Sequence, residues 1–167
     1  MLEQLIPLLG MRVDSKEIKD IFTDWNAIFP KRVTCTVEQP NIKGKVERNC
    51  IRLYFGRGGN SRYLKPVPAS WEGGFFGIFT TIGFTKKRRG DIPYDVEFDM
   101  DADEITEILG EPVVTDLATT WRKNISNKHE LVVFDGIIEG EQTRTMNISF
   151  VYEPDLFTME DYELKGL

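Results

Sequence analysis

The amino-acid sequence predicts an α+β protein in which an antiparallel β-sheet packs against N-terminal helices, with one short capped helix inserted between strands. Three observations lead to this prediction. Apolar residues recur with a helical period near the N-terminus, the period changes to two from Arg32 onward, and a second helical stripe interrupts the strands. Because hairpin-like spacing separates successive strand patterns, we expect antiparallel pairing.

The clearest helical pattern covers residues 14–29. Its apolar side carries six large residues: Ile18, Ile21, Phe22, Trp25, Ile28 and Phe29. Asp14 and Glu17 have the spacing of a capping box, in which each side chain satisfies a backbone N–H of the first turn, and Pro30 predicts the end of the helix. A shorter helix is expected before it over residues 2–9, closed by Gly10.

Alternation with period two predicts the strands. The clearest patterns cover residues 51–55, 76–84 and 146–152, and shorter candidates cover 33–37 and 131–134. Glycine, proline and charge clusters between them predict turns or loops at residues 56–59, 66–68, 73–74 and 86–90.

One further helix is expected within the second half of the chain. Asp101 and Glu104 form a second capping box, and a short apolar stripe follows at Ile105, Ile108 and Leu109. Gly110 and then Pro112 end this helix.

The composition predicts one domain over residues 1–167, with residues 153–167 as a loosely ordered acidic tail. The chain has 41% apolar residues, 11 Phe, 5 Tyr and 3 Trp, which is enough for one sizeable core. Cys35 and Cys50 could pair, but a chain with such a core does not need a disulfide, so we expect both to be reduced. No pattern of a signal peptide or a membrane span is present, which predicts a cytoplasmic protein.

Charge is divided unevenly along the chain. Residues 1–90 hold 16 Lys+Arg and 8 Asp+Glu, whereas residues 91–167 hold 5 and 19, so that the two parts carry +8 and −14. Residues 91–116 contain ten carboxylates and no Lys or Arg. Such a potential attracts an oppositely charged molecule, which predicts a basic protein partner and neither a nucleic acid nor a membrane.

The sequence does not predict an enzyme, a cofactor or a metal site. The single histidine, His129, lies in a polar stretch before a predicted strand and is expected in a surface loop. No nucleophile elbow, phosphate-binding loop or metal-spaced Cys/His pair is present. Asp99, Asp101 and Asp103 match the first ligand positions of a calcium-binding EF-hand, but Glu104 and Gly110 stand where the turn glycine and the bidentate carboxylate should be.

The acidic residues have a strand-like alternation of their own. In residues 95–101 the carboxylates fall on one predicted strand face, and Val96, Phe98 and Met100 fall on the other. With the helix that follows, the candidate partner-binding carboxylates are Asp95, Glu97, Asp99, Asp101, Asp103, Glu104 and Glu107. A solvated sheet face is the competing interpretation. No neighbouring Lys or Arg neutralises the run, however, and uncompensated repulsion costs stability, which favours a binding role.

Two other features leave alternatives open. Trp71 and Trp121 lie near predicted turns, so each either packs in the core or serves as a partly exposed anchor for a partner, and Trp121 joins the candidate binding residues. The basic run at residues 86–89 is expected to form a hairpin tip paired with acidic neighbours rather than a phosphate contact.

The order of these elements resembles a known group of proteins. Two N-terminal helices, the strand at residues 49–55, the aromatic strand at 75–84 and the capped helix ending at 108–112 are followed by Thr120-Trp121 and strands at 131–135 and 146–150. Over residues 1–152 this arrangement is similar to the small cytosolic immunity proteins of bacterial contact-dependent inhibition and other polymorphic toxin systems. The Leu-Gly-x-Pro helix end followed by a tryptophan and an apolar strand also resembles β-lactamase-inhibitor-like folds.

The resemblance implies an immunity protein that binds one cognate toxin domain, often a basic nuclease, as a monomer that forms a one-to-one heterodimer. The candidate carboxylates would then occupy a cationic groove as phosphate mimics. A cytosolic scaffold or small-ligand module remains the alternative, with a pocket lined by the aromatic residues of 75–84.

Overall fold

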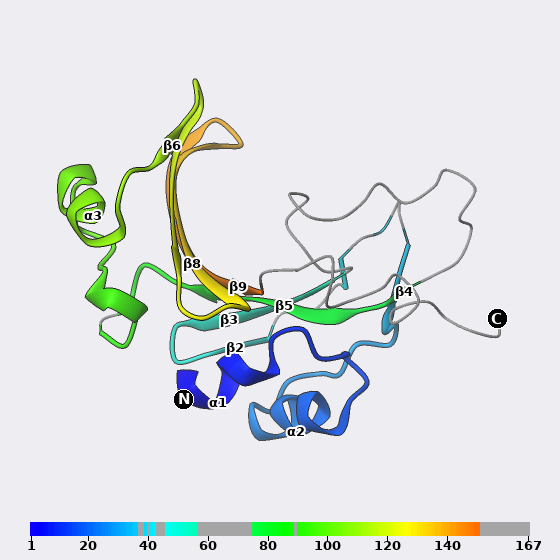
Figure 1. The fold of residues 1–167 in the computed structure, drawn as a ribbon. Coiled ribbons are helices and arrows are strands. Elements are labelled where there is room, and N and C mark those ends of the chain that lie inside the picture. The colour runs from blue at the N-terminus through cyan, green and yellow to red at the C-terminus, as the bar shows by residue number, and fades with distance from the viewer. Residues whose placement is uncertain (37–38, 40, 43–45, 57–74, 89, 151–167) are drawn as a thin grey trace.

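The fold is built on a strongly bent antiparallel sheet, seen in a computed structural model that describes residues 1–36, 39, 41–42, 46–56, 75–88 and 90–150 (Figure 1). The strands are β1 (Thr34–Cys35), β2 (Val46–Arg48), β3 (Ile51–Gly56), β4 (Phe75–Phe76), β5 (Ile78–Phe84), β6 (Val113–Val114), β7 (Ala118–Asn124), β8 (His129–Ile138) and β9 (Glu141–Phe150). The helices are α1 (Leu2–Leu5), α2 (Lys16–Asp24) and α3 (Ala102–Leu109), with 3₁₀ turns at Ile6–Leu8 and Pro93–Asp95.

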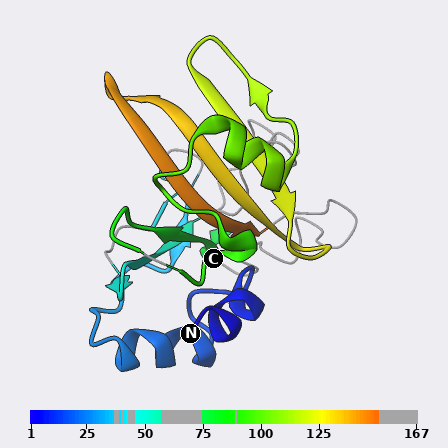
Figure 2. The same cartoon turned by 90° about the vertical axis from the view of Figure 1, so that its left-hand side faces the viewer.

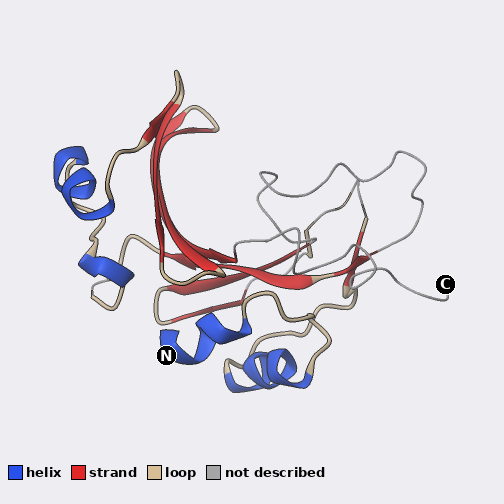
Figure 3. Cartoon of the chain, in the orientation of Figure 1, coloured by secondary structure: helices blue, strands red, loops and turns tan. Residues whose placement is uncertain are grey.

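The topology confirms the predicted α+β class. Seven strands of the described part form one sheet in the order β2-β3-β5-β9-β8-β7-β6, every pair antiparallel, and β1 pairs with β4 in a separate two-stranded sheet. The sheet bends along the length of β8 and β9, so that its β6 and β7 end rises steeply from the plane of β3 and β5 (Figures 1 and 3). The helices α1, α2 and α3 all lie on the outer side of this bend, as the turned view shows (Figure 2).

The core lies between these helices and the sheet. Two rows of side chains cross the sheet in register: Ile51, Phe84, Met146, Val133 and Trp121 form one, and Leu53, Ile82, Ile148, Leu131 and Lys123 form the other. All members are buried except Lys123. The period of two predicted β3, β5, β8 and β9 because one face of each packs on the core, whereas β7 was not predicted.

The start of α2 differs from its predicted capping box. The N-cap is Ser15, whose hydroxyl accepts a hydrogen bond from the Ile18 N–H at 3.4 Å. Asp14 instead pairs with Arg12 at 2.6 Å, and the hydrogen bond from that guanidinium keeps the pKa of Asp14 below its ordinary value. The predicted Asp14–Glu17 box is therefore wrong, because Asp14 is engaged by a cation two residues before it.

The predicted end of α2 is also wrong. The helix ends at Asp24 rather than just before Pro30. Asn26 has a φ of 51°, a left-handed conformation that asparagine tolerates and that stops a helix. Ile28, which the helical period placed on the apolar side, is 91% exposed, whereas Phe29 still packs against the core.

The N-terminal helix and the two cysteines agree with the sequence predictions, and several other predicted segments lie outside the described residues. The N-terminal helix is present as α1 followed by a 3₁₀ turn, with Gly10 at a φ of 91° after it. Cys35 and Cys50 are reduced, as predicted. Tyr152, Trp71, the expected turns at 57–59, 66–68 and 73–74, and the tail at 153–167 lie outside the described residues. No helix among the described residues is long and apolar enough to cross a membrane.

Candidate functional site

The acidic segment, which we define as residues 91–116, crosses the outer face of β7, β8 and β9 and ends in the edge strand β6 of the same sheet (Figures 1 and 2). It contains a 3₁₀ turn, a non-helical stretch at residues 96–101, the helix α3 and the edge strand β6. The carboxylates of the 96–101 stretch and of α3 therefore lie on the outer side of the sheet, and those beside β6 lie at its edge.

The predicted strand over residues 95–101 is wrong. Tyr94 and Asp95 have φ values of 66° and 56°, and this left-handed backbone directly after Pro93 breaks any extended run. The predicted alternation of burial nevertheless persists, since Val96 is buried and Asp99 is exposed. The apolar residues of this stretch pack inward, but no strand pairs with its backbone among the described residues.

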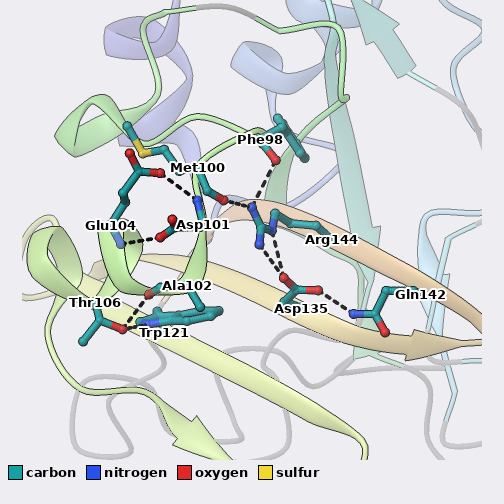
Figure 4. Close-up of polar contacts among 10 residues, drawn as sticks. All are labelled: Phe98, Met100, Asp101, Ala102, Glu104, Thr106, Trp121, Asp135, Gln142 and Arg144. Atoms are coloured by element: carbon teal, nitrogen blue, oxygen red, sulfur yellow. Dashed lines mark hydrogen bonds and ion pairs between the residues drawn. The ribbon is translucent and has the colours of Figure 1, made fainter.

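The backbone of residues 96–101 is held by the side chain of Arg144 on β9 instead of by a neighbouring strand. Its guanidinium donates hydrogen bonds to the carbonyl oxygens of Phe98, at 3.1 Å, and Met100 (Figure 4). The same group pairs with Asp135 of β8 at 2.5 Å, and Gln142 donates to the other oxygen of that carboxylate at 2.6 Å. A part-buried ion pair thus holds the backbone of the acidic segment on the sheet, and we call it the arginine clamp.

Asp135 titrates in an environment of opposing effects. Burial raises the pKa of its carboxyl. The hydrogen bonds from Arg144 and Gln142 lower that pKa by more than burial raises it, so that the pKa lies below its ordinary value. Asp135 is therefore ionised near neutral pH, and the arginine clamp is intact there.

The helix α3 begins as the sequence predicts and is held down by Trp121. Asp101 and Glu104 form the capping box, with the Glu104 N–H at 2.9 Å from the Asp101 carboxylate and the Asp101 N–H at 2.8 Å from the Glu104 carboxylate. The indole N–H of Trp121 donates to the Thr106 hydroxyl at 2.9 Å, and that hydroxyl donates to the carbonyl of Ala102 at 2.8 Å (Figure 4).

This placement corrects one candidate binding residue. Trp121 is only 1% exposed, so it lies in the core and is not a surface anchor for a partner. Its neighbours in register on β8 and its bond to α3 explain why a tryptophan close to a turn is buried. Trp121 positions the acidic segment rather than forming part of its surface.

A second cation holds the C-terminal end of α3. The ammonium group of Lys123 on β7 donates to the carbonyl of Ile108 at 2.5 Å and lies 4.6 Å from the centre of the Tyr94 ring. Tyr94 in turn donates its hydroxyl to the carbonyl of Asn124 at 2.5 Å. Because the last turn of α3 contains no basic residue, Lys123 supplies the cation that complements the helix dipole.

The carboxylates that remain form the candidate surface. Asp91 pairs with Arg88 at 2.8 Å, and Asp101 and Glu104 serve α3 as caps while staying exposed. Five of the predicted binding residues have no ion pair or hydrogen bond through their carboxylates in the described part of the chain: Asp95, Glu97, Asp99, Asp103 and Glu107. Glu97 is half-buried and the other four are exposed.

The basic turn after β5 contacts an acidic neighbour, as expected. Besides its pair with Asp91, Arg88 donates to the carbonyl of Asn49 at 3.2 Å, so this cation is engaged within the turn. Among the described residues no group of three or more His, Cys, Asp or Glu side chains is arranged to hold a metal ion.

His129 does not lie in a loop, which corrects the expectation. It is the first residue of β8, is half-buried, and its Nδ1 lies 2.9 Å from the Ser126 hydroxyl. Burial, and then the nearby Lys128 charge, lower the pKa of the imidazole, so that the folded protein favours the neutral ring.

We therefore expect stability to fall as the pH falls. A histidine with a lowered pKa in the folded state contributes fully above its unfolded pKa of about 6.5, and protonation destabilises the fold below it. His129→Gln should flatten the slope of unfolding free energy against pH between pH 7.5 and 5, because the chain has no other histidine. Denaturant unfolding at several pH values measures this; equal slopes in both proteins would contradict it.

The sequence analysis missed the residues that attach the acidic segment. Arg144 is in phase with the buried Met146 and Ile148, and Lys123 is in phase with Trp121. A cation on the apolar face of a strand is a signal in the sequence, because it needs a partner there. Its partners could not be predicted, since they are backbone carbonyls from a segment distant in the sequence.

The fold and this surface together define the class of protein: an α+β protein whose bent antiparallel sheet presents an acidic, clamped segment on its outer side. Comparison with known proteins adds no relative. No protein-family model matches the chain, and no curated protein or solved structure is similar to it.

Proposed function

We propose that this protein is a cytoplasmic immunity protein that binds a basic toxin domain, such as a nuclease, and neutralises it through the acidic segment. One observation carries the proposal. The surface carries a group of carboxylates that no cation within the described chain balances, although the chain holds 21 Lys and Arg residues in all. A partner that supplies the missing cations accounts for such a surface.

The way the segment is attached supports a binding role. The arginine clamp, the Trp121–Thr106 bond and the Lys123 contact hold it at three places along its length. Carboxylates on a fixed backbone lose little conformational freedom when a partner docks, so less of the interaction energy is lost to ordering.

The expected mode of inhibition follows from the charge. Carboxylates on the 96–101 stretch and along α3 present a series of anionic groups, as a nucleic-acid backbone does. A cationic groove that accommodates phosphates would accept them, and its substrate would then be excluded. Opposite potentials would also accelerate the encounter at low salt.

Charge reversal tests the proposal. The variant Asp99→Lys/Asp103→Lys/Glu107→Lys changes three exposed carboxylates, of which none pairs with another described residue. We expect its association rate with the polypeptide encoded immediately upstream to fall by about 10- to 100-fold at low salt. The difference from the natural protein should shrink as salt rises, because screening weakens the attraction. Stopped-flow or biosensor kinetics measure both rates.

A matched control separates position from net charge. Glu3→Lys/Glu17→Lys/Asp24→Lys makes the same change in net charge with exposed residues of the N-terminal helices. This variant should associate within about threefold of the natural protein. Equal losses in both variants, or no loss in either, would contradict the assignment of binding to the acidic segment.

The small-ligand alternative gains no support from the described residues. It required the aromatic residues of 75–84 to line a pocket. Phe79 instead packs against Phe55 at 5.2 Å between ring centroids, and Phe55 packs against Phe22 of α2 at 5.3 Å. These rings fill the space between sheet and helix.

A further inference from the structure

A cluster of exposed aliphatic side chains lies at the end of the sheet where β6, β7 and β8 meet. Its members are Val113, Val114, Leu117, Ile137 and Ile138, with exposed fractions of 50%, 69%, 69%, 52% and 43%. We call this cluster the apolar tip. Of the ten large hydrophobic residues exposed in the described part of the chain, these five lie at this one end of the sheet, whereas single exposed apolar residues are ordinary. By register, Val114, Leu117 and Ile137 lie on one face of the sheet, and Val113 and Ile138 lie on the other.

A backbone hydrogen bond brings Leu117 and Ile137 together. The Ile137 N–H donates to the carbonyl of Leu117 at 3.2 Å, which extends the pairing of β7 and β8 into the turn after β6. Gly136 permits this approach: a Cβ there would lie 2.6 Å from the Cβ of Ala118 and 2.7 Å from the Leu117 carbonyl oxygen. The β6–β7 turn and the β8–β9 turn therefore lie at the same end of the molecule (Figures 1 and 2).

Both turns are held in defined conformations. In the β6–β7 turn, the Thr115 N–H donates to the carbonyl of Ala118 at 2.8 Å, and the Ala118 N–H donates to the Thr115 hydroxyl at 3.2 Å. In the β8–β9 turn, Glu139 and Gly140 have φ values of 53° and 84°, the two positive values of a tight hairpin turn. The tip therefore exposes apolar side chains on fixed turns, which favours binding because little ordering is required.

The charges around the tip identify the kind of partner. Four exposed carboxylates surround it: Glu111, Asp116, Glu139 and Glu141. Residues 111–121 and 136–143 contain no Lys or Arg. A second copy of this chain would bring the same carboxylates against these, and an anionic membrane surface would also be repelled. A basic protein would pair with them.

We propose that the apolar tip is the anchoring site for a basic protein partner, which inserts an apolar side-chain cluster bordered by Lys and Arg between these four carboxylates. This inference rests on the proposed function and adds a division of roles. The acidic segment accelerates association, whereas the desolvated aliphatic contacts at the tip slow dissociation.

The test removes apolar surface without changing charge. Leu117→Ala/Ile137→Ala truncates two exposed residues of the tip, and Met11→Ala/Ile28→Ala truncates two exposed residues elsewhere, with exposed fractions of 36% and 91%. Each purified protein is measured on a biosensor against the polypeptide encoded immediately upstream, at low salt. We expect the tip variant to dissociate at least about tenfold faster with an association rate within about threefold, and the control to match the natural protein.

Three outcomes would overturn the inference. If the natural protein binds and the tip variant dissociates at the same rate, the tip is not the anchor and the proposed function stands. If the natural protein does not bind, the proposed function fails, and the partner assigned to the tip fails with it. If sedimentation shows a dimer of the natural protein that the tip variant does not form, a second copy occupies the tip.

Discussion

Trp121→Ala is expected to lower the free energy of unfolding by about 4 kcal/mol, the usual cost of truncating a fully buried aromatic residue. Trp121 is 1% exposed and lies at the end of a cross-strand row of core residues beneath α3. Its removal leaves a cavity there and also frees the Thr106 hydroxyl that its indole N–H contacts at 2.9 Å. Denaturant unfolding followed by circular dichroism measures the loss.

Two milder variants separate packing from hydrogen bonding. Trp121→Phe keeps much of the packed volume and loses the N–H, and Thr106→Val keeps the tryptophan and loses its acceptor. Each should cost about 1–2 kcal/mol, because a buried polar group loses its partner or its contacts. A loss below about 1 kcal/mol for Trp121→Ala would show that the residue is not the core contact between α3 and the sheet.

Arg144→Met is expected to lower the free energy of unfolding by about 3 kcal/mol. The variant breaks a part-buried ion pair and leaves the carboxylate of Asp135 without its cation. The side chains of Arg144 and Asp135 are 16% and 22% exposed. The variant also removes the donor to the carbonyls of Phe98 and Met100, so hydrogen exchange should accelerate across residues 96–101.

The pH dependence of this loss is a second test. The folded-state pKa of Asp135 is lowered, so its contribution is present above the unfolded pKa of about 3.9 and is lost as the pH falls through the folded pKa. The difference between natural protein and Arg144→Met should therefore shrink in acid. Lys16→Met breaks the exposed Lys16–Asp20 pair and should leave stability unchanged. An equally small loss for Arg144→Met would contradict the clamp.

The strands β3, β5, β8 and β9 and the helix α3 could be predicted because their patterns depend on one buried face and on local caps, whereas β2, β6 and β7 were not predicted. The alternation at Ile51, Leu53 and Phe55 reflects burial that the sheet enforces, and the Asp101–Glu104 box is complete within one turn. The ends of α2 could not be predicted in this way. The start depends on the pairing of Asp14 with Arg12, and the end depends on the left-handed backbone of Asn26. The helical period of apolar residues shows neither of these features.

The acidic residues of the candidate surface could be predicted from the sequence, but the contacts that hold their segment on the sheet could not. Alternation in residues 95–101 correctly separates buried Val96 from exposed Asp99, but it does not distinguish a strand from a segment held by side chains. The clamp joins Arg144 to carbonyls 44 and 46 residues away, a contact that only the tertiary fold creates. Proximity to a turn left Trp121 open as a core residue or as a partly exposed anchor, and the register of β7 on β8 buries it.

Co-purification with the polypeptide encoded immediately upstream, at low and high salt, tests the central claim most directly. We predict a stable one-to-one complex that forms more slowly at high salt, because screening weakens the attraction between a basic partner and the acidic segment. Recovery of the folded protein without that polypeptide at either salt concentration would contradict the account.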